Sequence, residues 1–81
     1  MIDSLAFVGL GYIGLPTAVV LAQSGVKVVG VDVSADRVTH INSGSSPIVE
    51  PGLEEALRAT LETGNFEAQT EMPETDVYVV A

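Results

Sequence analysis

The chain has 81 residues, of which 47% are hydrophobic and 17% charged, so a multi-domain enzyme and a disordered segment are both excluded. Eleven acidic against three basic residues give a net charge of −8, which opposes binding to nucleic acids and to anionic membranes. The chain has no cysteine, and this excludes a disulfide scaffold, a cysteine-ligated zinc site and a thiol nucleophile within these residues.

The charge is distributed unevenly along the chain. Residues 1–49 carry a net charge of −1 and residues 50–81 a net charge of −7, so the first, nearly neutral part is the better suited to handling a ligand. No run approaches the ~18 apolar residues of a membrane span, and the start lacks the basic residues of a signal peptide. We therefore expect a soluble, cytoplasmic protein with no nucleic-acid or membrane partner.

The first part of the chain predicts two strands joined by a helix. Residues 4–8 form a short apolar run that ends at a glycine, which is typical of a buried strand. Residues 13–24 are rich in Leu, Val and Ala and predict a helix; Pro16 is tolerated only in its first turn, so the helix begins no earlier than about Tyr12. Residues 26–31 are β-branched and almost continuously apolar, like a strand covered on both faces.

The second part predicts two helices followed by two strands. Ser34 is a good N-cap for a helix over residues 35–42, and leucines at spacings of four predict another helix over residues 53–63. Residues 66–70 are a weak strand candidate and residues 76–81 a strong one. This order predicts an α/β fold, and right-handed crossovers give parallel strands in the order 3-2-1-4, the N-terminal half of a Rossmann-type doubly wound sheet.

A glycine-rich hexapeptide lies between the first strand and the first helix. Residues 9–14 are Gly-Leu-Gly-Tyr-Ile-Gly, which matches G-x-G-x-x-G, a pattern that alone is weak in a chain with eight glycines. Its context strengthens it, because the next strand ends at Asp32, 18 residues beyond Gly14. Together these features indicate a dinucleotide-binding site. The alternative is that the glycines only make a strand-to-helix turn.

Each position of the hexapeptide has a physical task at such a site. Gly9 permits a tight turn, Gly11 lets a pyrophosphate approach the backbone, and Gly14 lets the helix pack closely on the sheet. We expect the N–H groups of Tyr12 and Ile13 to point at the pyrophosphate, which also meets the positive end of the helix dipole.

Asp32 is placed to accept hydrogen bonds from the ribose hydroxyls of an adenosine. Its charge repels a 2′-phosphate, so the sequence favours NAD over NADP. The alternative is a structural acid that caps the next helix through Ser34 or Asp36. His40 is the only imidazole and has no second metal ligand beside it, so no metal site is expected.

Five segments resemble the NAD-binding domain of the UDP-glucose/GDP-mannose dehydrogenase family, and together they cover essentially the whole chain. They are Gly9-Leu-Gly-Tyr-Ile-Gly-Leu-Pro-Thr17, Gly30-Val-Asp-Val33, Ile41-Asn-Ser-Gly44, Pro47-Ile-Val-Glu-Pro-Gly-Leu53 and Asp76-Val-Tyr-Val-Val-Ala81. The Leu-Pro-Thr after the third glycine is more similar to the UDP-N-acetyl-D-mannosamine branch of the family than to the UDP-glucose branch.

The resemblance implies an NAD-dependent enzyme that oxidises the C6 alcohol of a UDP-sugar to a carboxylate with two NAD, through an aldehyde held on a cysteine. It also implies cofactor contacts from Tyr12, Ile13, Asp32 and Arg37, with Arg37 near the adenine or ribose. From the residues alone, Arg37 is equally compatible with a solvated helix charge. The catalytic Cys and Lys and the UDP-sugar contacts of the family have no counterpart here, so no catalytic residue is assigned.

Residues 1–81 are therefore expected to be an NAD-binding Rossmann domain, truncated at its C-terminal end and inactive alone. Two other readings stay open: a UDP-glucose 6-dehydrogenase or another β-hydroxyacid-type dehydrogenase, and a non-catalytic dinucleotide-binding module. We also expect self-association, because the first predicted helix is apolar almost all round and the last strand leaves an unpaired sheet edge.

Overall fold

The computed structural model describes residues 4–81. Residues 1–3, whose lack of basic side chains was used to exclude a signal peptide, lie outside the described residues. Its elements are β1 (Ser4–Val8), α1 (Gly14–Gln23), β2 (Lys27–Val31), α2 (Ala35–Asn42), α3 (Leu53–Thr63), β3 (Phe66–Gln69) and β4 (Val77–Val80). The bounds of β1, α2 and α3 are those predicted, and the other elements are one or two residues shorter at their ends. One cause is Gly25, whose φ of +101° turns the chain before β2 begins.

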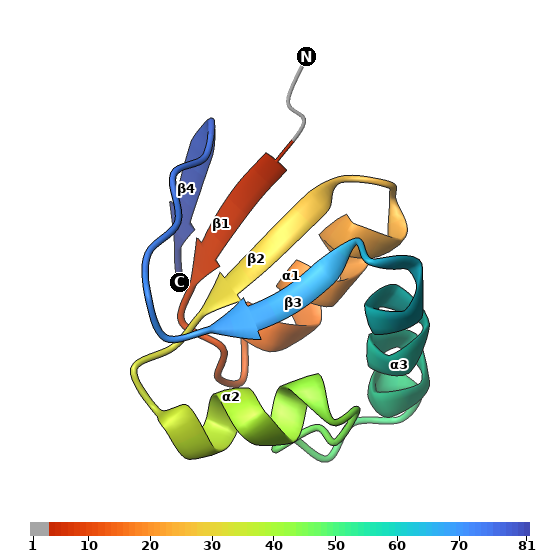
Figure 1. The fold of residues 1–81 in the computed structure, drawn as a ribbon. Helices are drawn as coiled ribbons and strands as arrows, with labels where there is room; N and C mark the ends of the chain where they lie inside the picture. The colour runs from red at the N-terminus through yellow and green to blue at the C-terminus, as the bar shows by residue number, and fades with distance from the viewer. Residues whose placement is uncertain (1–3) are drawn as a thin grey trace.

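The four strands form one parallel sheet in the order β3-β2-β1-β4, which confirms the predicted order (Figure 1). In the register of the sheet, Val8 at the end of β1 is paired with Val31 of β2 and with Val80 of β4. The carboxyl ends of these three strands therefore lie together along one edge. The order of the strands reverses between β1 and β4, which is where open α/β sheets place their ligands.

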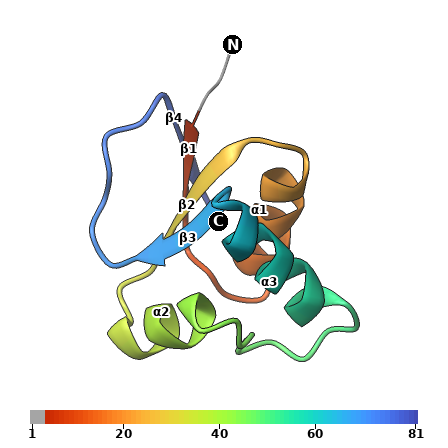
Figure 2. The same cartoon turned by 45° about the vertical axis from the view of Figure 1, so that its right-hand side comes forward.

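Helices α1 and α3 cover one face of the sheet, and the connection from β3 to β4 lies on the other side (Figure 2). The core between helices and sheet follows from the period of two in β1, which buries Leu5 and Phe7, and from the small residues Ala18 and Ala22 on one face of α1. In the part of the chain that the structure describes, no helix combines the length and apolar character needed to cross a membrane.

The outer edge of β3 is covered by the last residue of α2. Asn42 donates from Nδ2 to the carbonyl oxygen of Ala68 at 2.8 Å, and its Oδ1 accepts from the Ala68 N–H at 2.9 Å. The amide thus replaces one neighbouring-strand residue at an edge that would otherwise be unpaired there. These two bonds tie the C-terminal end of α2 to β3, and so help to hold the helix at the carboxyl edge of the sheet.

Candidate functional site

The chain turns sharply between β1 and α1, and the turn requires glycine. Gly9 has a φ of +98°, in the left-handed region that side chains rarely adopt. Its N–H donates to the carbonyl oxygen of Val31 at 2.8 Å, which ties the turn to the end of β2. The predicted role of Gly9 in a tight turn is what the backbone shows.

Gly14 and Gly11 differ in what surrounds them. A Cβ on Gly14 would lie 1.7 Å from the carbonyl oxygen of Gly9 and 3.4 Å from Cε1 of Phe7, so the turn and the start of α1 pack directly against each other. A Cβ on Gly11 would meet nothing within 4 Å. Gly14 therefore serves the packing of the turn, whereas Gly11 leaves the outer surface of the turn open to a ligand.

At the start of α1, some backbone donors have no partner within residues 4–81. Leu15 donates the first hydrogen bond, to the carbonyl oxygen of Gly11 at 3.1 Å, so the N–H groups of Tyr12 and Ile13 precede the i−4 bonds of the helix. Ile13 is the N-cap and makes no side-chain capping bond, and the first turn holds no acidic residue. Free N–H groups at the positive end of a helix dipole form an anion-binding arrangement.

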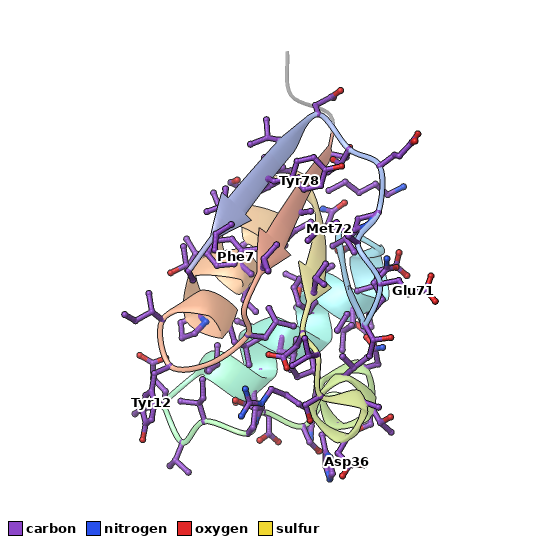
Figure 3. The ribbon with its side chains drawn as sticks, turned by 90° about the vertical axis from the view of Figure 1, so that its left-hand side faces the viewer. Phe7, Tyr12, Asp36, Glu71, Met72 and Tyr78 are labelled. Carbon is purple, nitrogen blue, oxygen red and sulfur yellow. The ribbon has the colours of Figure 1, made fainter. Side chains whose placement is uncertain are left out.

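Two hollows lie along the carboxyl edge of the sheet and share Gly9. The first, of about 240 Å³, lies between the turn and the end of β4 and is lined by Gly9, Gly11, Tyr12, Ile13, Gly14 and Ala81. The second, of about 150 Å³, is lined by Val8, Gly9, Val31, Asp32 and Val33. Tyr12 is 86% exposed, and Figure 3 shows its side chain pointing away from the turn, so an aromatic ring stands beside the first hollow.

Asp32 follows β2 and is buried, with 9% of its surface exposed. Its Oδ1 accepts from the Ser34 N–H at 3.0 Å, and its Oδ2 accepts from the Leu10 N–H at 3.1 Å and from Nη1 of Arg37 at 3.4 Å. Burial raises the pKa of Asp32, but the two backbone donors and the charge of Arg37 outweigh burial and hold the pKa below its ordinary value. The carboxylate is therefore ionised near neutral pH.

The bonds of Asp32 limit what it can still accept. An ionised carboxylate has roughly four acceptor positions, and the three donors leave one, on Oδ1. Asp32 thus supports the turn into α2 through Ser34, as the structural alternative supposed, and keeps one position for a ligand donor. Of the two predicted capping partners, Asp36 donates no hydrogen bond to the carboxylate in the described residues.

Arg37 is not a freely solvated charge. The Oγ of Ser34 accepts from the Arg37 N–H at 3.2 Å, which confirms Ser34 as the N-cap and places Arg37 in the first turn of α2. Its guanidinium then reaches back to Asp32, while the side chain keeps 42% of its surface exposed. The pair thus joins the end of β2 to the start of α2.

Comparison with known proteins places this geometry in a family. The model of the UDP-glucose/GDP-mannose dehydrogenase family, NAD binding domain, matches residues 3–81. The chain belongs to this family.

Relatives within the dehydrogenase family match over nearly the whole chain. The UDP-N-acetyl-D-mannosamine dehydrogenase of Methanococcus maripaludis (strain C7) is 44% identical over 79 residues, which cover 98% of this chain and 18% of the relative. The solved UDP-N-acetyl-mannosamine dehydrogenase of Staphylococcus aureus has a TM-score of 0.93 at 40% identity, over 96% of this chain and 19% of that one. The UDP-glucose dehydrogenase of Pyrobaculum islandicum has a TM-score of 0.92 at 39% identity, over 100% and 20%. The chain thus spans about a fifth of the length of these relatives.

In this NAD-binding domain the structure brings the seven predicted site residues to one edge of the sheet. Five line the first hollow, and Asp32 lies beside the second with Arg37 in contact with it. Sequence reasoning anticipated the contact of Asp32 with Ser34 but missed the Leu10 N–H on Asp32 and Ala81 in the first hollow. The site residues come together because Val8 is paired with Val31 and with Val80 in the sheet. Only a knowledge of this register could have predicted the missed contacts. Residues 4–81 hold no group of three acidic or histidine side chains that could bind a metal ion.

The second and third glycines of the motif are predicted to respond differently to an added methyl group. Gly14→Ala should lower the free energy of unfolding by about 1–3 kcal/mol, because its Cβ meets a backbone oxygen that cannot move independently of the turn. Gly11→Ala, the matched control, should change it by less than ~0.5 kcal/mol. Urea denaturation of both variants measures this. Equal losses would show that the close contact at Gly14 does not control stability.

Proposed function

We propose that this chain forms the NAD-binding part of a UDP-N-acetylmannosamine-type dehydrogenase, which oxidises the sugar C6 alcohol to a carboxylate with two NAD. The observation that carries the proposal is the open glycine turn and uncapped helix start beside an ionised Asp32, at the point where the strand order reverses. Family membership and the mannosamine-type relatives support the same reading.

The residues fit a dinucleotide laid along the carboxyl edge. The pyrophosphate would lie over Gly11 and accept from the N–H groups of Tyr12 and Ile13, since these donors are free and nothing fills the space above Gly11. The adenosine ribose would donate to the remaining acceptor position of Asp32. The rest of the dinucleotide would then extend past Gly9 toward Ala81 and the end of β4.

Bound NAD supplies a hydride acceptor, and the residues of this chain bind and orient it. The paired Asp32 is held rigidly by donors from three segments, so little ordering is needed when the ribose binds. We propose that the catalytic thiol and base, and the UDP-sugar contacts, are supplied by the remainder of the enzyme. A UDP-glucose 6-dehydrogenase is the second candidate, because the Pyrobaculum islandicum structure has nearly the same TM-score, 0.92 against 0.93.

Asp32 is predicted to favour NAD over NADP by at least ~10-fold in affinity, since a 2′-phosphate beside the carboxylate costs more than ~1.4 kcal/mol. Asp32→Ser should shrink this ratio by weakening NAD and relieving the repulsion on NADP. Calorimetric titration of both cofactors against the complete enzyme and against its Asp32→Ser variant measures the ratio. Equal affinities in the unchanged protein, or an unchanged ratio in the variant, would remove Asp32 from the site.

The 81 residues alone are predicted to catalyse no sugar oxidation, because they contain no cysteine to hold an aldehyde intermediate. The assay follows NADH formation with UDP-N-acetylmannosamine and with UDP-glucose, for these residues and for the complete enzyme. We expect NADH only from the complete enzyme, and faster with the mannosamine sugar. A faster rate with UDP-glucose would establish the second candidate. NADH formation by the 81 residues alone would contradict the proposal that the remainder of the enzyme supplies the catalytic thiol and base.

We further propose that the protein acts in the cytoplasm and that these 81 residues self-associate. Val20 on α1 and Val80 on β4 are 62% and 77% exposed, and β4 is an edge strand of the sheet. The net charge of −8 opposes association, so salt should promote it by screening the repulsion. Sedimentation at low and high salt is the measurement, and a single monomeric species at both would count against self-association.

A further inference from the structure

We infer that Arg37 sets how strongly this site distinguishes NAD from NADP, and that Asp32 does not do so alone. The inference rests on the proposed NAD site and concerns the balance of charge within it. An unpaired carboxylate at the end of β2 would reject a 2′-phosphate by simple repulsion. Here the carboxylate already has a cationic partner that a phosphate could share.

Arg37 partly neutralises the charge of Asp32. Nη1 of Arg37 lies 3.4 Å from Oδ2, and both groups are at the carboxyl edge of the sheet. A 2′-phosphate brought to this place meets a paired charge rather than a lone negative one. The repulsion is therefore weaker than the position of the aspartate in the sequence indicates.

Arg37 has donors to spare beyond those that Asp32 uses. A guanidinium has five N–H groups, the structure gives Arg37 one side-chain partner, and 42% of the side chain is exposed. Its other donors can therefore receive an anion without releasing Asp32. Arginine offers a planar fork that suits phosphate oxygens.

No other basic side chain in residues 4–81 can take this role. Lys27 begins β2, at the opposite end of that strand from Asp32. Arg58 donates to Glu54 at 3.0 Å and to the carbonyl oxygen of Gly44 at 3.2 Å, so it is engaged between α3 and the loop that precedes it. Arg37 is thus the one cation at the edge where the two hollows lie.

Three donors converge on the carboxylate of Asp32. The N–H groups of Leu10 and Ser34 and the guanidinium of Arg37 all point at Asp32. Two backbone N–H groups beside an arginine also form a suitable site for a phosphate group. Asp32 occupies that site as an internal anion, so its removal should expose donors that a 2′-phosphate can use, provided that Arg37 is present.

The test separates the charge of Arg37 from a merely structural role. Titrations with NAD and with NADP are made on the unchanged protein, Arg37→Gln, Arg37→Lys and the matched control Arg58→Gln. Arg37→Gln should raise the NAD-to-NADP affinity ratio by about 10-fold, because it removes the only cation that can share a 2′-phosphate. Arg37→Lys and Arg58→Gln should keep the ratio within about 3-fold of the unchanged protein.

The same titrations in an Asp32→Ser background keep the inference testable if NADP binds too weakly to the unchanged protein. Asp32→Ser should gain NADP affinity, and adding Arg37→Gln should abolish that gain. Equal weakening of NAD and NADP by Arg37→Gln would overturn the inference, as would a gain in Asp32→Ser that survives the loss of Arg37. Failure of the unchanged protein to bind either cofactor would instead overturn the proposed function.

Discussion

The site depends on the hydrogen bonds to the buried carboxylate of Asp32, because its three donors come from three separate segments of the chain. Leu10 belongs to the glycine turn, Ser34 to the turn after β2, and Arg37 to α2. A buried anion is costly unless it is paired and hydrogen-bonded. Together the three donors offset the cost of burying the ionised Asp32, and the same bonds hold the turn, the strand end and the helix in fixed relation.

The glycine turn is also anchored by the side chain of Leu10, at a position where the G-x-G-x-x-G motif specifies no residue. Leu10 is completely buried, and a Cβ on Gly30 of β2 would lie 2.8 and 2.9 Å from its two methyl carbons. Gly30 thus provides the space into which Leu10 packs. With the side chain of Leu10 fixed, its N–H is presented to Asp32. A glycine in the middle of β2, outside the hexapeptide, is therefore part of what shapes the cofactor turn.

The sequence predicted the fold well because each element has a local cause. Glycines at residues 9, 25 and 64 mark where strands and helices begin or end, and Ser34 caps α2 through its own hydroxyl. The order of the elements together with right-handed crossovers determined the order of the strands. The contacts that complete the site had no such local signal. The pairing of Asp32 with the Leu10 N–H joins residues 22 apart, and it follows from sheet register rather than from any pattern along the chain.

The distribution of charge explains how an acidic chain can hold an anionic cofactor. Of the eleven acidic residues, eight lie in residues 50–81, which form α3, β3, β4 and their connections, whereas the glycine turn and α1 contain none. Repulsion between exposed charges is screened beyond about 8 Å at physiological salt, so the overall charge has little influence on a group in contact with the turn. What such a group meets is the set of free N–H groups at the start of α1. In the proposed binding mode, affinity for a pyrophosphate is therefore determined by backbone dipoles at short range, and the one charged pair at this edge in the described residues, Asp32 with Arg37, would distinguish between cofactors.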